Sequence, residues 1–182
     1  MANETAVLGG GCFWCTEAIY QRVRGVKSVT PGYAGGQVEN PTYHAVCGGD
    51  TGHAEVVQIE FDLDDISYEE IIEIFWHIHD PTTLNRQGND IGTQYRSIIL
   101  YANDKQRLIA EKSMKDFIEE GEFQNEIVTE IVPLVRFYKA EDYHLNYFDN
   151  NTSQPYCRAI ISPKINHFMD DYSEKLKPDI LK

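Results

Sequence analysis

The chain has 182 residues, of which 42% are hydrophobic, 25% charged and 12% aromatic. This length and composition predict one globular domain with a sizeable core, and they exclude disordered, collagen-like and coiled-coil chains. The formal net charge is −13, with no Lys or Arg from Ser28 to Asn85, which argues against nucleic acid as a partner and against an anionic membrane surface.

The first half of the chain reads as short strands and helices separated by glycine-rich turns. Three glycines at 9–11 interrupt the first strand, and Gly25 ends the first helix. Ser67 and Glu70 form a capping box, and Pro81 ends the helix that follows it. The predicted elements are a strand at 5–8, a helix at 12–24, an extended segment at 26–33, a turn-rich loop at 35–52, a strand at 54–61 and a helix from 67 to about 78.

The second half adds a polar loop at 81–93, a strand at 95–101, a helix at 104–119, a strand at 127–137 and a short helix at 141–149. Beyond Asn150 the chain reads as turn-like, and residues 169–182 as a loosely held C-terminal tail. The order β-α-β-β-α-β-α-β predicts one α+β catalytic domain over residues 1–182. We expect a two-layer sandwich in which helices cover one face of a largely antiparallel mixed sheet with a split βαβ, ferredoxin-like core.

Cys12 begins the first predicted helix directly after the glycines. Backbone N–H groups at a helix start favour an anion, so we expect a depressed pKa and a partial thiolate at Cys12. The alternative is a small buried cysteine without reactivity. Phe13 and Trp14 cannot both face the core, so Trp14 is expected beside Cys12, as an apolar wall suited to a small group such as a methyl.

Glu55 is the second informative residue. Strand alternation places it on the side that carries Val57, Ile59 and Phe61, which should face the core. Burial would raise the pKa of this carboxyl and keep it protonated, which suits a general acid. The alternative is a glutamate at a strand end that turns to water.

The remaining sequence signals concern metals and location. Four cysteines are too few for a disulfide scaffold, and only Cys12 and Cys15 form a closely spaced pair, so we expect no zinc site. No run of about 18 apolar residues is present, and residues 1–5 lack the basic start of a signal peptide. We therefore expect a cytoplasmic protein without a membrane partner.

Several motifs together resemble the A-class peptide methionine sulfoxide reductases over residues 6–168. The motifs are Gly10-Gly-Cys-Phe-Trp14, Pro31-Gly-Tyr-Ala-Gly-Gly36, Asn40-Pro-Thr-Tyr43, Gly52-His-Ala-Glu-Val56, His79-Asp-Pro81, Gln87-Gly-Asn-Asp90 and Gly92-Thr-Gln-Tyr-Arg-Ser97. The resemblance implies a thiol enzyme without a metal or organic cofactor, which reduces methionine S-sulfoxide in proteins and peptides and is recycled by thioredoxin. Nothing in the sequence argues for an oligomer, so we expect a monomer.

The resemblance also implies roles for individual residues. Cys12 would attack the sulfoxide sulfur and become a sulfenic acid, while Phe13 and Trp14 would line the pocket for the substrate's ε-methyl. The polar groups that it implies around the sulfoxide oxygen are Tyr43, Glu55, Asp90 and Tyr95. A buried, neutral Glu55 could protonate that oxygen, and the tyrosines could hold it.

A second thiol must resolve the sulfenic acid before thioredoxin can act. We expect Cys157, because it follows a turn-rich segment that could move and because the family often resolves through a Tyr-Cys dipeptide. Cys15 is the next candidate, since Cys-X-X-Cys pairs at helix starts form disulfides. Cys47 comes third, because its glycine-flanked loop suggests a structural thiol.

Two other functions are considered. A general thiol–disulfide oxidoreductase would use the Cys12–Cys15 pair, but it leaves Glu55, Tyr43 and Tyr95 unexplained and lacks its usual parallel βαβ context. A non-catalytic acidic binding module would leave the thiol at the helix start without a role.

Overall fold

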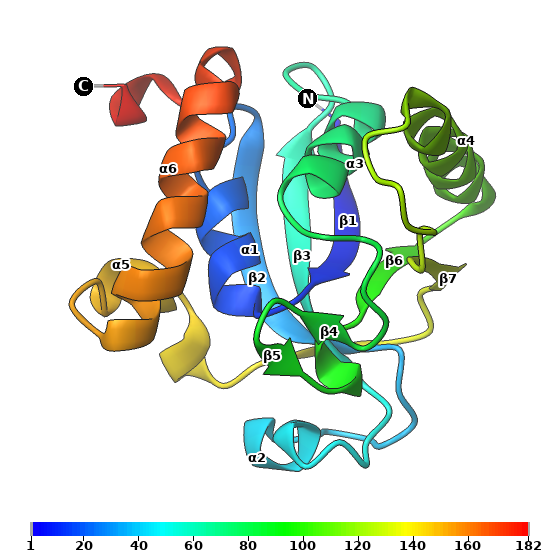
Figure 1. Ribbon diagram of the computed structural model, residues 1–182, viewed down its shortest axis with the longest axis vertical. Coiled ribbons are helices and arrows are strands. Elements are labelled where there is room, and N and C mark those ends of the chain that lie inside the picture. Colours follow the sequence, from blue (N-terminus) through cyan, green and yellow to red (C-terminus); the bar gives the residue numbers. More distant parts are fainter. Residues whose placement is uncertain (1, 182) are drawn as a thin grey trace.

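The computed structural model describes residues 2–181, and it is a mixed α/β structure (Figure 1). None of the described helices is both long and apolar enough to cross a membrane. The helices and strands are β1 (Asn3–Gly10), α1 (Phe13–Tyr20), β2 (Val26–Ala34), α2 (Tyr43–Cys47), β3 (Ala54–Asp62), α3 (Tyr68–His77), β4 (Arg86–Gln87), β5 (Asp90–Ile91), β6 (Ser97–Tyr101), α4 (Asp104–Glu120), β7 (Glu130–Pro133), β8 (Phe137–Lys139), α5 (Tyr147–Asn150) and α6 (Ser162–Asp171).

The main sheet of the described chain has the strand order β7-β6-β1-β3-β2-β8. All neighbouring strands in it are antiparallel except β6 and β7, which are parallel. The prediction of a largely antiparallel mixed sheet is therefore confirmed. Strands β4 and β5 form a separate small hairpin.

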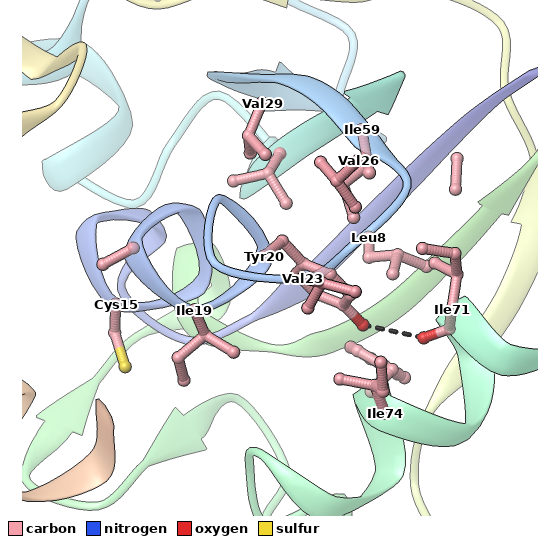
Figure 2. Close-up of a cluster of buried hydrophobic side chains, with 14 of the residues drawn as sticks. Leu8, Cys15, Ile19, Tyr20, Val23, Val26, Val29, Ile59, Ile71 and Ile74 are labelled. Carbon is pink, nitrogen blue, oxygen red and sulfur yellow. Dashed lines mark hydrogen bonds between the residues drawn. The ribbon is translucent and has the colours of Figure 1, made fainter. Parts of the chain in front are cut away.

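Helices α1 and α3 pack against one face of this sheet and enclose the main core (Figure 2). Leu8 of β1 and Ile59 of β3 meet Ile19 of α1 and Ile71 of α3 in this core, and all four are at most 1% exposed. The two helices are joined where the buried Tyr20 hydroxyl donates a hydrogen bond to the Ile71 carbonyl at 2.8 Å. Burying each such aliphatic side chain contributes about 1.5–3 kcal/mol to folding.

Strand β1 continues through two of the glycines that were expected to interrupt it. Gly9 pairs with Ile98 of β6, and a Cβ at Gly9 would lie 2.8 Å from the Glu55 carbonyl oxygen. The strands can approach this closely because glycine has no side chain. Only Gly11, at φ 98°, turns the chain. Cys12 therefore follows the end of a central strand, beside the start of β3.

The predicted strand at 127–137 is wrong, because β7 and β8 lie at opposite edges of the sheet. Proline lacks an N–H group and suits a strand end, and β7 ends at Pro133. The chain then crosses the second face of the sheet, where Val132, Leu134 and Phe137 pack on a small apolar cluster around Val56. Helices thus cover one face, as expected, and this crossing segment covers the other.

The C-terminal region contains more helix than the sequence suggested. The predicted helix at 141–149 is broken by Asn146, whose φ of 56° separates a 3₁₀ turn at 142–144 from α5. Residues after 150 were expected to be turn-like, but a π-helical turn at Cys157–Ile161 continues into α6. The buried residues Ile161, Ile165 and Phe168 have the spacing of one helix face, which explains why this segment folds as a helix.

The expectation of a loosely held tail at 169–182 is also wrong for the residues described, which end at 181. Leu176 is 3% exposed and forms a β-bridge with Val23. The Arg24 amide donates to the Lys175 carbonyl at 2.7 Å, and the Lys177 amide donates to the Arg22 carbonyl at 2.9 Å. These backbone bonds and one buried leucine fix the tail against the end of α1.

The tail should therefore contribute to stability. Replacing Leu176 with Ala removes a buried side chain and should lower the free energy of unfolding by about 2–4 kcal/mol. The exposed Leu181 is the matched control, and Leu181→Ala should change it by less than about 0.5 kcal/mol. Urea denaturation measures both; equal, small effects would mean that the tail is loose after all.

Candidate active site

Cys12 lies at the N-cap of α1 and is partly exposed. Its thiol is within hydrogen-bonding reach of the Trp14 amide and the Tyr156 hydroxyl. Burial, and then the nearby Glu55 carboxyl, raise the pKa of this thiol well above its usual value, and the Trp14 amide only partly offsets them. The expected depressed pKa and partial thiolate are therefore wrong, because desolvation outweighs the helix start.

Glu55 is 1% exposed and faces the main core side, as strand alternation predicted. Its Oε1 accepts a hydrogen bond from the Phe13 amide at 3.2 Å. Its Oε2 is buried and has no hydrogen-bond partner among residues 2–181. Burial raises the pKa of Glu55 to about 8, against the lowering effect of the Phe13 amide. At neutral pH this carboxyl is thus mostly protonated beside the Cys12 thiol.

Three further polar residues come from different loops. Tyr43 begins α2, and burial and then Glu55 raise its pKa. The pKa of Tyr95 is likewise raised, first by burial and then by the charges of Glu55, Asp90 and Cys12. Asp90, on the β4–β5 hairpin, accepts a hydrogen bond from the Tyr156 hydroxyl at 2.6 Å. The structure thus gathers these groups around the thiol.

An aromatic wall lies on the other side of Cys12. Phe13 is buried and Trp14 is partly exposed, as the sequence suggested. The Phe13 ring stacks on Tyr43 with centroids 6.3 Å apart, and the Trp14 ring stacks on Tyr147 at 3.7 Å and 11°. The site therefore has an apolar side and a polar side, which can orient a group that has a methyl and an oxygen on one atom.

Sequence reasoning missed the residues that hold this wall in place. The Trp14 indole N–H donates to Nδ1 of the buried His144 at 2.9 Å. Glu141 accepts hydrogen bonds from the Tyr43 amide at 2.8 Å and from the Tyr33 hydroxyl at 2.9 Å. These contacts join positions about 100 residues apart, so no local pattern in the sequence could indicate them.

All four cysteines are free thiols. Cys15 is buried on α1, and it contributes to the raised pKa of Cys12. Cys157 is fully buried in a π-helical turn, directly after the turn-rich segment at 150–156 that was expected to move. Cys47 is exposed, in contrast to the expected structural thiol, and is hydrogen-bonded to Tyr43. Within residues 2–181 no three His, Cys, Asp or Glu side chains are placed to hold a metal ion.

Comparison with known proteins gives a consistent result. A family model described as peptide methionine sulfoxide reductase matches residues 4–177. A peptide methionine sulfoxide reductase MsrA of Saccharolobus solfataricus is 60% identical over 174 residues, covering 96% of this chain and 97% of the relative. Reduced Mxr1 of Saccharomyces cerevisiae is 36% identical, with a TM-score of 0.78 over 85% of this chain and 89% of Mxr1. Mxr1 of Saccharomyces cerevisiae in complex with Trx2 is 26% identical, with a TM-score of 0.56 over 80% of this chain and 84% of Mxr1.

The raised pKa of Glu55 predicts a pH-dependent stability. Between the ordinary value of 4.5 and about 8, the folded chain holds a proton that the unfolded chain has lost, so the free energy of unfolding falls as pH rises. The glutamine in Glu55→Gln cannot titrate. Between pH 5 and pH 8.5, the free energy of unfolding of the wild type should therefore fall by about 3 kcal/mol relative to that of this variant. Urea denaturation at both pH values measures this; parallel pH profiles would contradict a neutral Glu55.

Proposed function

This chain belongs to the peptide methionine sulfoxide reductase family, and we propose that its site reduces the S-sulfoxide of methionine through Cys12. The chain is a thiol-dependent oxidoreductase of methionine sulfoxide that thioredoxin recycles. The roles of its individual residues are argued below from the geometry.

The assignment of roles rests on one observation. A buried, protonated Glu55 lies beside the Cys12 thiol, and its Oε2 has no hydrogen-bond partner among the described residues. A sulfoxide sulfur becomes a good electrophile when its oxygen is protonated. Glu55 gives its proton to that oxygen as the Cys12 sulfur attacks, and its carboxylate then accepts the proton that the thiol loses. The sum is sulfoxide plus thiol giving thioether plus sulfenic acid, with the sulfoxide sulfur reduced by two electrons and Cys12 oxidised by two.

The two sides of the site orient the substrate. Phe13 and Trp14 receive the ε-methyl, while Tyr43 and Tyr95 hold the oxygen near Glu55. Asp90 is held by Tyr156 and completes the polar side. Because the methyl and the oxygen have fixed places, only one sulfoxide epimer presents its oxygen to Glu55, and we propose that this is the S epimer.

The sulfenic acid is resolved within the chain by Cys15 or Cys157. Two arguments favoured Cys157, a preceding segment that could move and a Tyr-Cys dipeptide like that of the family, and burial of the thiol in a helical turn weakens the first. Support for Cys15 is its place three residues after Cys12 on the same helix, within electrostatic reach of that thiol. We therefore propose that Cys15 attacks the sulfenic acid first, releasing water and forming a disulfide, and that Cys157 is the second candidate.

The same reasoning extends to assembly and fold. The groups that the site uses come from one chain, which supports a monomer, and four free thiols suit the reducing cytoplasm.

Helix α1 joins β1 to β2, and α3 connects β3 with β6 through the β4–β5 hairpin. The antiparallel order β6-β1-β3-β2 supports the proposed split βαβ core.

A single-turnover assay with a methionine sulfoxide peptide tests the function. Cys12→Ser should form no methionine, because a serine hydroxyl is not a usable nucleophile without a strong base. Glu55→Gln keeps the thiol and loses the proton, so its first turnover should be slower by about 100-fold or more. Methionine formed per enzyme is measured by mass spectrometry of the peptide.

Three outcomes would contradict this scheme. Substantial reduction by Cys12→Ser would move the nucleophile to another cysteine, and an unchanged rate in Glu55→Gln would remove Glu55 from the acid role. Reduction of insulin disulfides without reduction of the sulfoxide would favour a general thiol–disulfide oxidoreductase.

The resolving thiol is tested with thioredoxin as reductant. Cys15→Ser should keep a full first turnover and lose multiple turnovers, because the sulfenic acid on Cys12 is no longer converted to a disulfide. Peptide mapping of the oxidised wild type should show a Cys12–Cys15 disulfide. A Cys12–Cys157 disulfide, with loss of recycling in Cys157→Ser only, would return the role to Cys157.

A further inference from the structure

Glu17 is a buried carboxylate on α1 that the proposed reaction does not use. It is 1% exposed and lies five residues after Cys12. Its Oε2 accepts a hydrogen bond from the Asn146 amide at 3.1 Å, and the Tyr147 amide lies close enough to lower the pKa of this carboxyl, which burial raises to about 7. A buried carboxylate is stabilised by such bonds, so the contact ties α1 to a segment 129 residues away.

The backbone at this contact is shaped to hold an anion. Asn146 has the left-handed conformation, with φ 56° and ψ 32°, and Tyr147 begins the right-handed α5. Successive amides in these two conformations point their N–H groups into one concavity, which binds negative charge. The Glu17 carboxyl lies at this turn and accepts the Asn146 amide, so the side chain and the chain reversal fix each other.

Neighbouring side chains of α1 strengthen the same junction. Gln21 donates a hydrogen bond to the Asn146 side-chain oxygen, and Arg22 forms an ion pair with Asp149 at 3.0 Å. The surface ion pair contributes little. The buried carboxylate of Glu17 is therefore the main polar link between α1 and the start of α5.

This junction sets the position of the aromatic ring that covers Trp14. The Asn146 amide bonds Glu17, while the ring of the next residue, Tyr147, stacks on the Trp14 indole at 3.7 Å. The indole N–H is also bonded to His144, which precedes the same turn. A shift of the chain at Asn146 would thus move both groups that hold Trp14.

We propose that Glu17 is a positioning residue for the methyl-binding wall, which acts by fixing the Asn146–Tyr147 backbone so that Tyr147 holds Trp14 beside Cys12. This inference rests on the proposed role of Trp14 in binding the sulfoxide substrate. Glu17 itself touches neither the thiol nor the substrate.

The test uses Glu17→Gln, which keeps the shape but removes the charge and replaces one carboxylate oxygen with an NH2 group that cannot accept a bond from the backbone. The KM for a methionine sulfoxide peptide should rise about tenfold, as for loss of a hydrogen bond to a charged group. The saturated first-turnover rate should stay within about twofold, because Cys12 and Glu55 are untouched.

The matched control is Glu70→Gln. Glu70 accepts the Ser67 amide at 2.9 Å in the cap of α3, so the same substitution removes the charge of a carboxylate that accepts a backbone amide away from the wall. Its KM should equal that of the wild type. A KM in Glu17→Gln no higher than in Glu70→Gln would overturn the positioning role.

Two further measurements separate positioning from general stability. The chain's two tryptophans, Trp14 and Trp76, each donate an indole N–H bond of 2.9 Å, to His144 and to Ser113. Glu17→Gln should shift the NMR resonance of the Trp14 indole and leave that of Trp76 in place. In a Tyr147→Ala background, Glu17→Gln should raise KM little further, because the two act through one contact.

Fully additive effects on KM, or equal shifts of both indole resonances, would overturn the proposal. These outcomes leave the proposed function intact as long as the wild type reduces the sulfoxide. Failure of the wild type to form methionine would instead overturn the function itself.

Discussion

The buried carboxyl of Glu55 is the constraint on which the site depends. Placing an ionised carboxylate in a low-dielectric interior costs several kcal/mol, so the group holds its proton, and burial raises its pKa to about 8. Its Oε1 is occupied by the Phe13 amide at the start of α1. This one bond fixes the distance between β3 and the residue after Cys12, and it leaves the second oxygen to face the site.

The rest of the fold brings the other groups to that carboxyl. The absence of a side chain at Gly9 lets β1 lie close to β3 and β6, so that Cys12 emerges at the end of a central strand. Helix α2 carries Tyr43, and the β4–β5 hairpin carries Asp90. The segment at 141–156 then closes the site from the C-terminal side and supplies Tyr147 and Tyr156. The site is therefore built from segments far apart in sequence, and its geometry depends on tertiary packing.

That dependence explains what the sequence could predict. Strand alternation placed Glu55 in the core because a period of two is a local property of the chain. The helix start at Cys12 and the capping box at Ser67 were local as well, and both are present. The shift of the Cys12 pKa was predicted with the wrong sign. The helix start is a local feature of the sequence, whereas the burial of the thiol and the nearby Glu55 carboxyl depend on the tertiary fold. The same limit applies to the predicted strand at 127–137. Its two parts, β7 and β8, pair with opposite edges of the sheet, and the strand available at each edge is set by the fold of the whole chain.

The raised pKa of Cys12 helps to decide between the functions considered. A general thiol–disulfide oxidoreductase depends on a thiol of low pKa, since the thiolate is the nucleophile. Here burial and the Glu55 carboxyl keep Cys12 protonated, which makes it a slow nucleophile toward ordinary disulfides. In the proposed reaction, a bound sulfoxide takes the Glu55 proton, and the carboxylate that remains can accept the proton of the thiol. Under this proposal Cys12 becomes nucleophilic only with a substrate that carries a basic oxygen, which would select a sulfoxide over a disulfide.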